Sequence, residues 1–212
     1  MMLDFYHSPN TRSTGVRILL DELGANYRLH ALDMPGGETR APAYLAVNPM
    51  GKVPAIVHDG ALVTEQGAIY LYLADAFSAA GLAPSIGDPL RGPYVRWLAF
   101  YGSSFEPAVV DRAMQREPGR QGMSPYGDFD TMLGTLLTQL GRGPYILGEQ
   151  FTAADILWGM ALGWMTQFKL LPEHPDSAAY VARLWVRPSV TRVRALDAEL
   201  AAEQAAAAGR AP

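Results

Sequence analysis

The chain has 212 residues, of which 49% are hydrophobic, and a formal net charge of −4 at pH 7. Its length permits one or two domains of ordinary size, and its apolar residues are numerous enough to build a buried core. The acidic balance and the lack of a dense Lys/Arg block argue against a nucleic-acid partner. The absence of cysteine excludes disulfides, thiolate metal sites and any redox cycle that uses a protein thiol.

The sequence carries no signal for a membrane or a metal. No apolar run approaches the ~20 residues that a membrane helix needs, and Asp4 interrupts the N-terminus before a signal-type apolar stretch could form. We therefore expect a cytoplasmic protein with no membrane partner. The histidines have no spacing typical of metal ligands, so no metal site is expected; they are His7, His30, His58 and His174.

The first part of the chain alternates between strand and helix patterns. Strands are predicted over residues 2–6, 27–32, 55–58 and 61–63, and helices over residues 16–23, 41–47 and 66–77. Asp59-Gly60 separates the last two strands and is a two-residue hairpin signal, because its turn needs positive φ values. The predicted order is therefore β-α-β-α-β-β-α.

After residue 77 the pattern changes to helices alone. Ser78–Arg91 contains several Gly and Pro residues without helical periodicity and is interpreted as a linker. Helices are predicted over residues 94–100, 128–140, 156–168 and 178–185, and a last one on the apolar positions Val190, Val193, Leu196 and Leu200. The Ala-rich tail over residues 201–212 has no apolar stripe and is expected to fray.

Two motifs near residue 60 indicate a site for a short peptide. Val53-Pro54 predicts an extended dipeptide, since proline fixes φ and lacks an N–H group. An extended ligand can pair with the backbone N–H and C=O of Val53 as an added strand does, while Glu65 binds a terminal ammonium. Glu65 alone is equally explained as an acidic residue that complements a helix dipole.

The turn before the first helix is the candidate chemical centre. A helix start offers unpaired N–H groups and the positive end of the macrodipole, so it stabilises an anion placed near Asn10–Ser13. A thiolate is such an anion. The structural alternative for Ser8, Asn10, Thr11 and Ser13 is ordinary helix capping.

In its motifs and their order, the chain resembles the cytosolic glutathione transferases, and specifically bacterial members with a Ser-Pro-Asn active-site turn. The resemblance rests on residues 8–10, 48–54, 65–66 and 151–155. It implies a thioredoxin-like glutathione-binding domain (1–78), a linker (79–90) and an all-helical domain (91–212) that forms the electrophile pocket. It also implies a cis peptide bond before Pro54 and a homodimer.

The resemblance assigns roles to individual residues. Asn10 leads as the residue that contacts the sulfur, with Ser8 and Thr11 as further catalytic candidates; no tyrosine or cysteine matches a classical activating position. The glutathione-binding candidates are Lys52, Val53, Pro54, Glu65, Gln66 and Arg40. Gln66 stands where the family usually has serine. Lys52 is equally explained as a solvated surface residue, and Arg40 is better explained that way.

Further motifs belong to the helical part. Thr152 and Asp155 have the spacing of a capping box, which predicts a structural role for both. Tyr101 and Phe105 are candidates for the wall of the electrophile pocket, although aromatic residues at helical spacing more often form core.

The leading hypothesis is an enzyme for detoxification that conjugates glutathione, its cosubstrate, to a small hydrophobic electrophile. The alternatives are a noncatalytic binding or regulatory module with the same fold, and a glutathione-dependent isomerase or dehalogenase. Disulfide reduction is disfavoured because the chain lacks cysteine.

Overall fold

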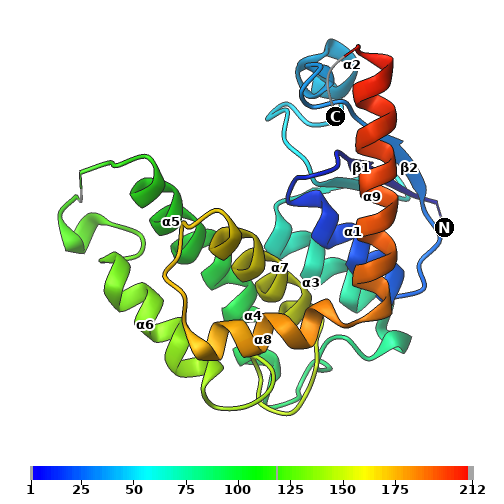
Figure 1. Ribbon diagram of the computed structural model, residues 1–212. Coiled ribbons are helices and arrows are strands. Elements are labelled where there is room, and N and C mark those ends of the chain that lie inside the picture. The colour runs from blue at the N-terminus through cyan, green and yellow to red at the C-terminus, as the bar shows by residue number, and fades with distance from the viewer. Residues whose placement is uncertain (1, 118, 210–212) are drawn as a thin grey trace. The chain divides into compact units, whose positions relative to one another are not determined.

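Figure 1 presents a computed structural model, which describes residues 2–117 and 119–209. Its contacts divide the chain into two compact units, one formed by Met1–Ala80 together with Arg187–Pro212, and the other by Gly81–Val186. None of the helices in the described residues has the length and apolar character needed to cross a membrane.

The first unit is built on a four-stranded sheet with the order β2-β1-β3-β4. Strand β1 runs parallel to β2 and antiparallel to β3, which pairs antiparallel with β4. Its elements are β1 (Leu3–His7), α1 (Ser13–Glu22), β2 (Arg28–Ala31), η1 (Glu38–Arg40), α2 (Pro42–Leu45), β3 (Ala55–His58), β4 (Ala61–Thr64), α3 (Gln66–Ala76), η2 (Ser78–Ala80) and α9 (Pro188–Ala207). The predicted element order up to residue 77 and the predicted fold class are confirmed.

Local turn chemistry explains the β3–β4 hairpin. Asp59 and Gly60 have φ values of 49° and 88°, as a two-residue turn with positive φ requires. Helices α1 and α3 pack against each other and against the sheet, so the apolar side of α1 is buried. The core of this unit therefore lies between the sheet and these two helices.

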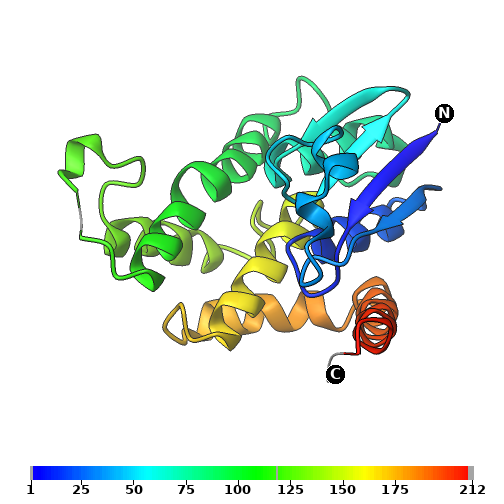
Figure 2. The same cartoon turned by 90° about the horizontal axis from the view of Figure 1, so that it is seen from above.

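Helix α9 belongs to the first unit, whereas the resemblance implied a helical domain over residues 91–212 that includes it. It packs along α1, as both views show (Figures 1 and 2). Arg187 donates two hydrogen bonds of 2.7 Å to the Glu22 carboxylate, and Arg192 pairs with Asp21. These charged contacts join α9 to α1, and they involve residues too far apart in sequence for a periodicity argument to find.

The buried face of α9 differs from the predicted one. Leu196 was expected to pack, but 41% of it is exposed, whereas Asp197 is only 4% exposed. The helix also continues to Ala207 instead of fraying from residue 201, because alanine has the highest intrinsic helix propensity. Residues 210–212 of the predicted frayed tail lie outside the described residues.

The second unit is helical throughout its regular elements. They are α4 (Arg91–Phe100), the π-helical segment η3 (Tyr101–Phe105), α5 (Glu106–Ala113), η4 (Gln121–Met123), α6 (Phe129–Leu140), α7 (Ala153–Gln167) and α8 (Pro175–Trp185). The four helices predicted between residues 94 and 185 are present. The sequence analysis missed η3 and α5. Phe105 and Glu106 at their junction both have helical backbone angles, so α5 continues directly from η3, with Pro107 in its first turn.

The core of the helical unit centres on Trp158. Its ring lies 5.9 Å from that of Trp97, 5.7 Å from that of Tyr101 and 4.9 Å from that of Phe105, all in edge-to-face geometry. These four side chains are at most 2% exposed. Their packing fixes η3 against α7.

Asp155 has the structural role that its capping-box motif predicts. Its carboxylate accepts hydrogen bonds of 2.7 Å from the backbone N–H of Thr152, the backbone N–H of Ile146 and the hydroxyl of Tyr180. The capping box between Thr152 and Asp155 is complete. Burial raises the pKa of Asp155 above its ordinary value despite these hydrogen bonds.

A cavity of about 630 Å³ lies between α7 and α8. It is lined by Gly163, Thr166, Glu173, His174, Pro175, Ser177, Ala178, Val181, Ala182 and Trp185. None of the site residues predicted from the sequence belongs to this lining.

Candidate functional site

The strand register brings the predicted site motifs to one end of the sheet. Tyr6 pairs with Ala55 across β1 and β3, and Ala55 pairs with Thr64 across β3 and β4. Because both pairings are antiparallel, the chain leaves β1, enters β3 and leaves β4 at the same end. The segments that meet there are residues 8–13, 48–54 and 65–66.

The loop before β3 is held by its own side chains. The Asn48 amide nitrogen donates to the Lys52 carbonyl at 2.8 Å, and its oxygen accepts from the Met50 N–H at 3.1 Å. The Tyr44 hydroxyl donates to the same Lys52 carbonyl at 2.6 Å. Burial raises the pKa of Tyr44, so its hydroxyl remains a donor. The backbone on which Val53 sits is therefore fixed before a ligand arrives.

Glycine is the one residue type that fits position 51 in this loop. Its φ is +58°, and a Cβ there would lie 2.6 Å from the Thr39 carbonyl oxygen and 2.9 Å from the Arg40 guanidinium. The backbone conformation therefore favours glycine, and the close approach to the Thr39 carbonyl requires it.

The Val53-Pro54 peptide bond is cis, as the resemblance implied. Pro54 is buried, and Val53 is half-buried. Within residues 2–117 and 119–209, neither the N–H nor the C=O group of Val53 takes part in a backbone hydrogen bond. Both groups are therefore free to pair with an extended ligand.

Glu65 and Gln66 stand at the start of α3. Glu65 is exposed and has φ 64° and ψ 125°, which is a strained conformation for a residue other than glycine. The Gln66 amide donates to the Arg12 carbonyl at 3.2 Å, so this side chain ties α3 to the turn before α1. The strain at Glu65 is consistent with a carboxylate held in place for a ligand.

The two predicted cations occupy the outside of the loop. Lys52 is exposed. Arg40 is exposed as well, and its guanidinium donates to the Met50 carbonyl at 3.1 Å, which makes it part of the loop's own support.

The turn between β1 and α1 exposes one of the predicted catalytic side chains and buries another. Asn10 is exposed, has φ 57° and makes no side-chain hydrogen bond to any residue that the structure describes. Ser8 is fully buried, and its hydroxyl has no hydrogen-bond partner among the described residues. Thr11 is half-buried, and its hydroxyl donates to the Ser8 carbonyl at 2.7 Å.

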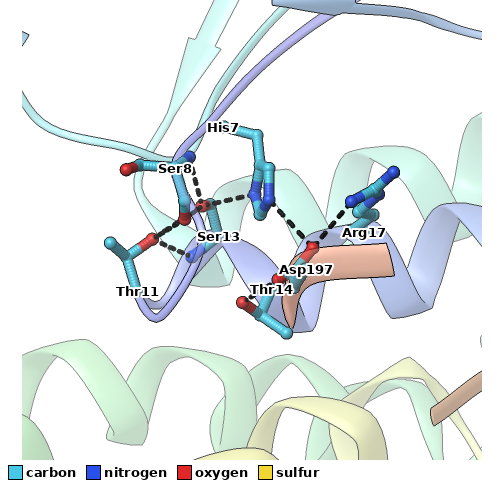
Figure 3. A network of polar contacts seen from close by, with 7 residues as sticks. All are labelled: His7, Ser8, Thr11, Ser13, Thr14, Arg17 and Asp197. Carbon is cyan, nitrogen blue, oxygen red and sulfur yellow. Dashed lines mark hydrogen bonds and ion pairs between the residues drawn. The ribbon is translucent and has the colours of Figure 1, made fainter. Parts of the chain in front are cut away.

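A chain of hydrogen bonds leads from this turn into the core (Figure 3). The Thr11 and Ser13 hydroxyl oxygens are 2.7 Å apart, and Ser13 Oγ lies 2.8 Å from His7 Nδ1. His7 Nε2 lies 3.1 Å from Asp197 Oδ1. The last helix of the chain is therefore connected to the turn at the start of the first helix.

Asp197 gathers three partners around one carboxylate. Besides His7, it accepts from the Arg17 guanidinium at 2.7 Å and from the Thr14 hydroxyl at 2.5 Å. Burial alone would raise the pKa of Asp197, but the hydrogen bonds from His7, Thr14 and Arg17 outweigh it and hold the pKa below its ordinary value. Asp197 is therefore ionised at neutral pH.

The sequence analysis missed His7 and Asp197. His7 was considered only as a metal ligand, although it directly precedes the candidate turn. Asp197 lies four residues after Val193 and seven after Val190, both buried, so helical spacing alone would have marked it as a carboxylate on a buried face.

The aromatic pocket candidates lie in the core of the helical unit. Tyr101 is 2% exposed and Phe105 is fully buried, and both pack against Trp158. Their role as a wall for an electrophile stays a prediction. Among the described residues, no three His, Asp or Glu side chains form a group that could hold a metal ion.

Two family models match the chain. Residues 1–75 match the glutathione S-transferase N-terminal domain, and residues 107–195 match the glutathione S-transferase C-terminal domain. The two matches cover both the sheet with its candidate site and most of the helical elements.

Known proteins resemble the chain over most of its length. Glutathione S-transferase 3 of Schizosaccharomyces pombe is 31% identical, covering 73% of this chain and 70% of that protein. The disulfide-bond oxidoreductase YfcG of Escherichia coli K12 is 28% identical, covering 96% and 99%. A sphingomonad glutathione S-transferase, solved in complex with glutathione, superimposes with a TM-score of 0.75 at 29% identity, covering 92% and 98%. With this fold and these matches, the chain belongs to the glutathione S-transferase family.

Proposed function

We propose that the protein conjugates the thiolate of glutathione to a small hydrophobic electrophile. Family membership identifies the chain as a glutathione transferase in general terms, and the electrophile class and the site residues are the finer part of the proposal. The observation that carries it is the meeting of the turn 8–13, the loop 48–54 and the start of α3 at one end of the sheet. A ligand placed there meets all three motifs at once.

The unpaired backbone of Val53 and the carboxylate of Glu65 suit the two ends of a γ-glutamyl peptide. A ligand backbone paired with Val53 gains main-chain hydrogen bonds, and Glu65 offers a charge-assisted contact to the γ-glutamyl ammonium. Lys52 and Arg40, both exposed, supply positive charge for the glycyl carboxylate. The sphingomonad structure with bound glutathione supports glutathione as the cosubstrate.

The thiolate is placed at the turn before α1. Helix α1 has 10 residues, and its first N–H groups with the positive end of its dipole favour an anion. Asn10 leads as the donor because its side chain is exposed and makes no hydrogen bond to the described residues. Ser8 is less suited to direct contact, since its hydroxyl is buried.

Ionisation of the thiol explains only part of the expected rate enhancement. Lowering the thiol pKa by ~2 units requires about 2.7 kcal/mol of preferential stabilisation of the anion. A lower pKa increases the fraction of thiol that is ionised, but it also makes the thiolate a weaker nucleophile, with a Brønsted slope of about 0.4–0.5. The two effects together leave a net gain in rate of roughly threefold. The larger contribution comes from holding the thiolate and the electrophile together.

Retention on immobilised glutathione, followed by turnover of a chloronitroarene, tests the proposal. A transferase is retained and forms the conjugate with release of chloride. Retention without conjugation across a broad panel of electrophiles would instead establish a noncatalytic binding module, and absence of retention would overturn both. The panel should include substrates for glutathione-dependent isomerisation and dehalogenation.

A second candidate activity is suggested by the relative named a disulfide-bond oxidoreductase. The chain has no cysteine, so all thiols in such a reaction would come from glutathione. Two glutathione molecules would reduce one disulfide to two thiols and become oxidised glutathione. Turnover of a small disulfide faster than that of the chloronitroarene would favour this activity.

We also propose, from family membership, that the protein is cytoplasmic and forms a homodimer.

A further inference from the structure

We infer that His7 accepts the thiol proton of bound glutathione through a relay formed by Thr11 and Ser13. This inference rests on the proposed function, because it needs the glutathione sulfur at the turn before α1. It assigns a proton-accepting role to a residue outside the turn, and it explains why the last helix of the chain supplies a carboxylate to the site.

The relay has an accessible end and a buried end. Thr11 is half-buried, Ser13 and His7 are fully buried, and Asp197 is 4% exposed. The Thr11 and Ser13 hydroxyl oxygens are 2.7 Å apart, Ser13 Oγ lies 2.8 Å from His7 Nδ1, and His7 Nε2 lies 3.1 Å from Asp197 Oδ1. Each is a normal hydrogen-bond distance, so neighbouring groups can exchange a proton without rearrangement of the backbone.

The Asp197 carboxylate sets the tautomer of His7. Because an ionised carboxylate can only accept, the nitrogen that faces it, Nε2, carries the hydrogen. In the neutral imidazole Nδ1 is then an acceptor for the Ser13 hydroxyl. The hydroxyl of Thr11 can in turn donate to Ser13 when its hydrogen is turned away from the Ser8 carbonyl, and every donor along the chain then points inward.

The Ser8 carbonyl gives both hydroxyls a second acceptor. It lies 2.7 Å from the Thr11 hydroxyl oxygen and 3.0 Å from that of Ser13. A hydroxyl hydrogen can therefore rotate between this carbonyl and the relay. The backbone N–H of Ser8 also donates to Ser13 Oγ at 3.2 Å, which holds that oxygen in line with His7.

The relay moves one proton from the glutathione sulfur to the His7 imidazole. The S–H bond breaks and the proton passes to Thr11, whose own proton passes to Ser13, whose proton forms an N–H bond at His7 Nδ1. The products are a thiolate and an imidazolium that donates to Ser13 and Asp197. The hydroxyls now point outward, so Thr11 donates a hydrogen bond to the thiolate. Reversal of the chain later returns the proton to the product or to solvent.

The charges around His7 offset one another. Arg17 and Asp197 form an ion pair beside the imidazole, so a proton on His7 adds one positive charge, which the negative charge of the new thiolate offsets. Tyr27 interacts with Arg17 from the segment before β2. The nearby strands carry their own partnered groups: Asp4 pairs with Arg28 and His30, and His58 bonds to Tyr72.

Proton counting by calorimetry tests the relay in the unaltered protein. Glutathione is titrated at neutral pH in buffers of different ionisation enthalpy, while ultraviolet absorbance measures thiolate formation. The expected result is that far less than one proton reaches the buffer for each thiolate formed, because His7 keeps the thiol proton. Release of one proton per thiolate would overturn the relay. S-methylglutathione, which has no thiol proton, should bind without any proton uptake or release.

The His7→Asn variant removes the proton acceptor and is paired with the control His30→Asn. His30 also contacts an aspartate, Asp4, but it lies on β2 and outside the relay. We expect His7→Asn to release a full proton for each thiolate formed and to shift the rising limb of the kcat/KM pH profile, with S-methylglutathione affinity within about twofold of wild type.

The control variant, His30→Asn, should retain the thiol proton as the wild type does. If His7→Asn matches the control in proton count and pH profile, His7 has only a structural role. If the wild type gives no binding heat with glutathione at millimolar concentration, it is the proposed function that fails, and the two failures are thereby separated.

Discussion

Asp197 on the last helix and His7 at the end of the first strand meet at 3.1 Å, although 190 positions separate them in the sequence. Both side chains are almost completely buried. This contact joins α9 to the turn that carries the candidate catalytic residues, and its consequences for stability and chemistry can be measured separately.

Replacement of Asp197 by alanine should lower the free energy of unfolding by about 3–5 kcal/mol, the usual cost of breaking a buried ion pair. Arg17 would be left as a buried cation without its carboxylate, and Thr14 and His7 would lose their acceptor. Urea denaturation at neutral pH measures the change.

Asp21→Ala is the matched control for this measurement. It also removes an ion pair between α1 and α9, but its partner Arg192 is exposed. Exposed pairs contribute about 0–1 kcal/mol, so this variant should remain close to wild type. Equal losses in the two variants would contradict the importance of the buried network.

The same carboxylate should give the protein a pH-dependent stability. The pKa of Asp197 is lowered in the folded state, so ionised Asp197 stabilises the fold above its unfolded-state pKa. This contribution begins to be lost when the pH falls below about 4, the ordinary pKa of an aspartate in the unfolded chain. The loss is complete once the pH has fallen through the lower pKa of Asp197 in the folded state. Urea unfolding of the wild type and Asp197→Asn should therefore give free energies that converge on acidification. A difference that stays constant from pH 6 to pH 3 would exclude this origin.

Gly51→Ala should destabilise the loop that presents Val53. The positive φ costs about 1–2 kcal/mol for a residue with a Cβ, and contact with the Thr39 carbonyl adds to it. Gly60→Ala provides the control, because Gly60 has φ +88° but no atom within 4 Å of a Cβ. Thermal unfolding should show a larger loss for Gly51→Ala, together with weaker glutathione binding; equal losses would show that steric contact is unimportant.

Two substitutions of Glu65 separate binding from backbone strain. Glu65→Ala should weaken glutathione binding by about 1.5–3 kcal/mol, the value of a hydrogen bond to a charged group. Glu65→Gly should weaken binding similarly but raise the free energy of unfolding by about 1 kcal/mol relative to Glu65→Ala, because glycine accepts φ 64° without strain. Calorimetry and urea denaturation measure the two effects; full affinity in either variant would remove Glu65 from the site.

Asn10→Ala should raise the pKa of the bound glutathione thiol while leaving retention on immobilised glutathione largely intact. The exposed Asn10 amide is the proposed donor to the thiolate, so its loss removes stabilisation from the anion alone. Ultraviolet titration of the thiolate gives the pKa directly. An unchanged titration would exclude Asn10 from this role.

The sequence by itself determined the features that depend on near neighbours. The hairpin at Asp59-Gly60 and the Thr152–Asp155 capping box follow from local backbone chemistry, and the helices follow from their apolar periodicity. The family resemblance added the cis bond before Pro54 and the order of the two domains, because motifs such as Val53-Pro54 and Glu65-Gln66 keep their spacing along the chain.

Only the tertiary structure decided which distant residues share an environment. It assigned α9 to the first unit instead of the helical domain, and it buried Asp197 in place of Leu196. It also paired the Asp197 carboxylate with His7, a partner that sequence spacing could not indicate. The physical reason is that local patterns fix the conformation of a segment, whereas the partner of a buried charge depends on how segments pack. The turns of the candidate site could therefore be predicted from the sequence, whereas the buried network of His7 and Asp197 depends on tertiary packing.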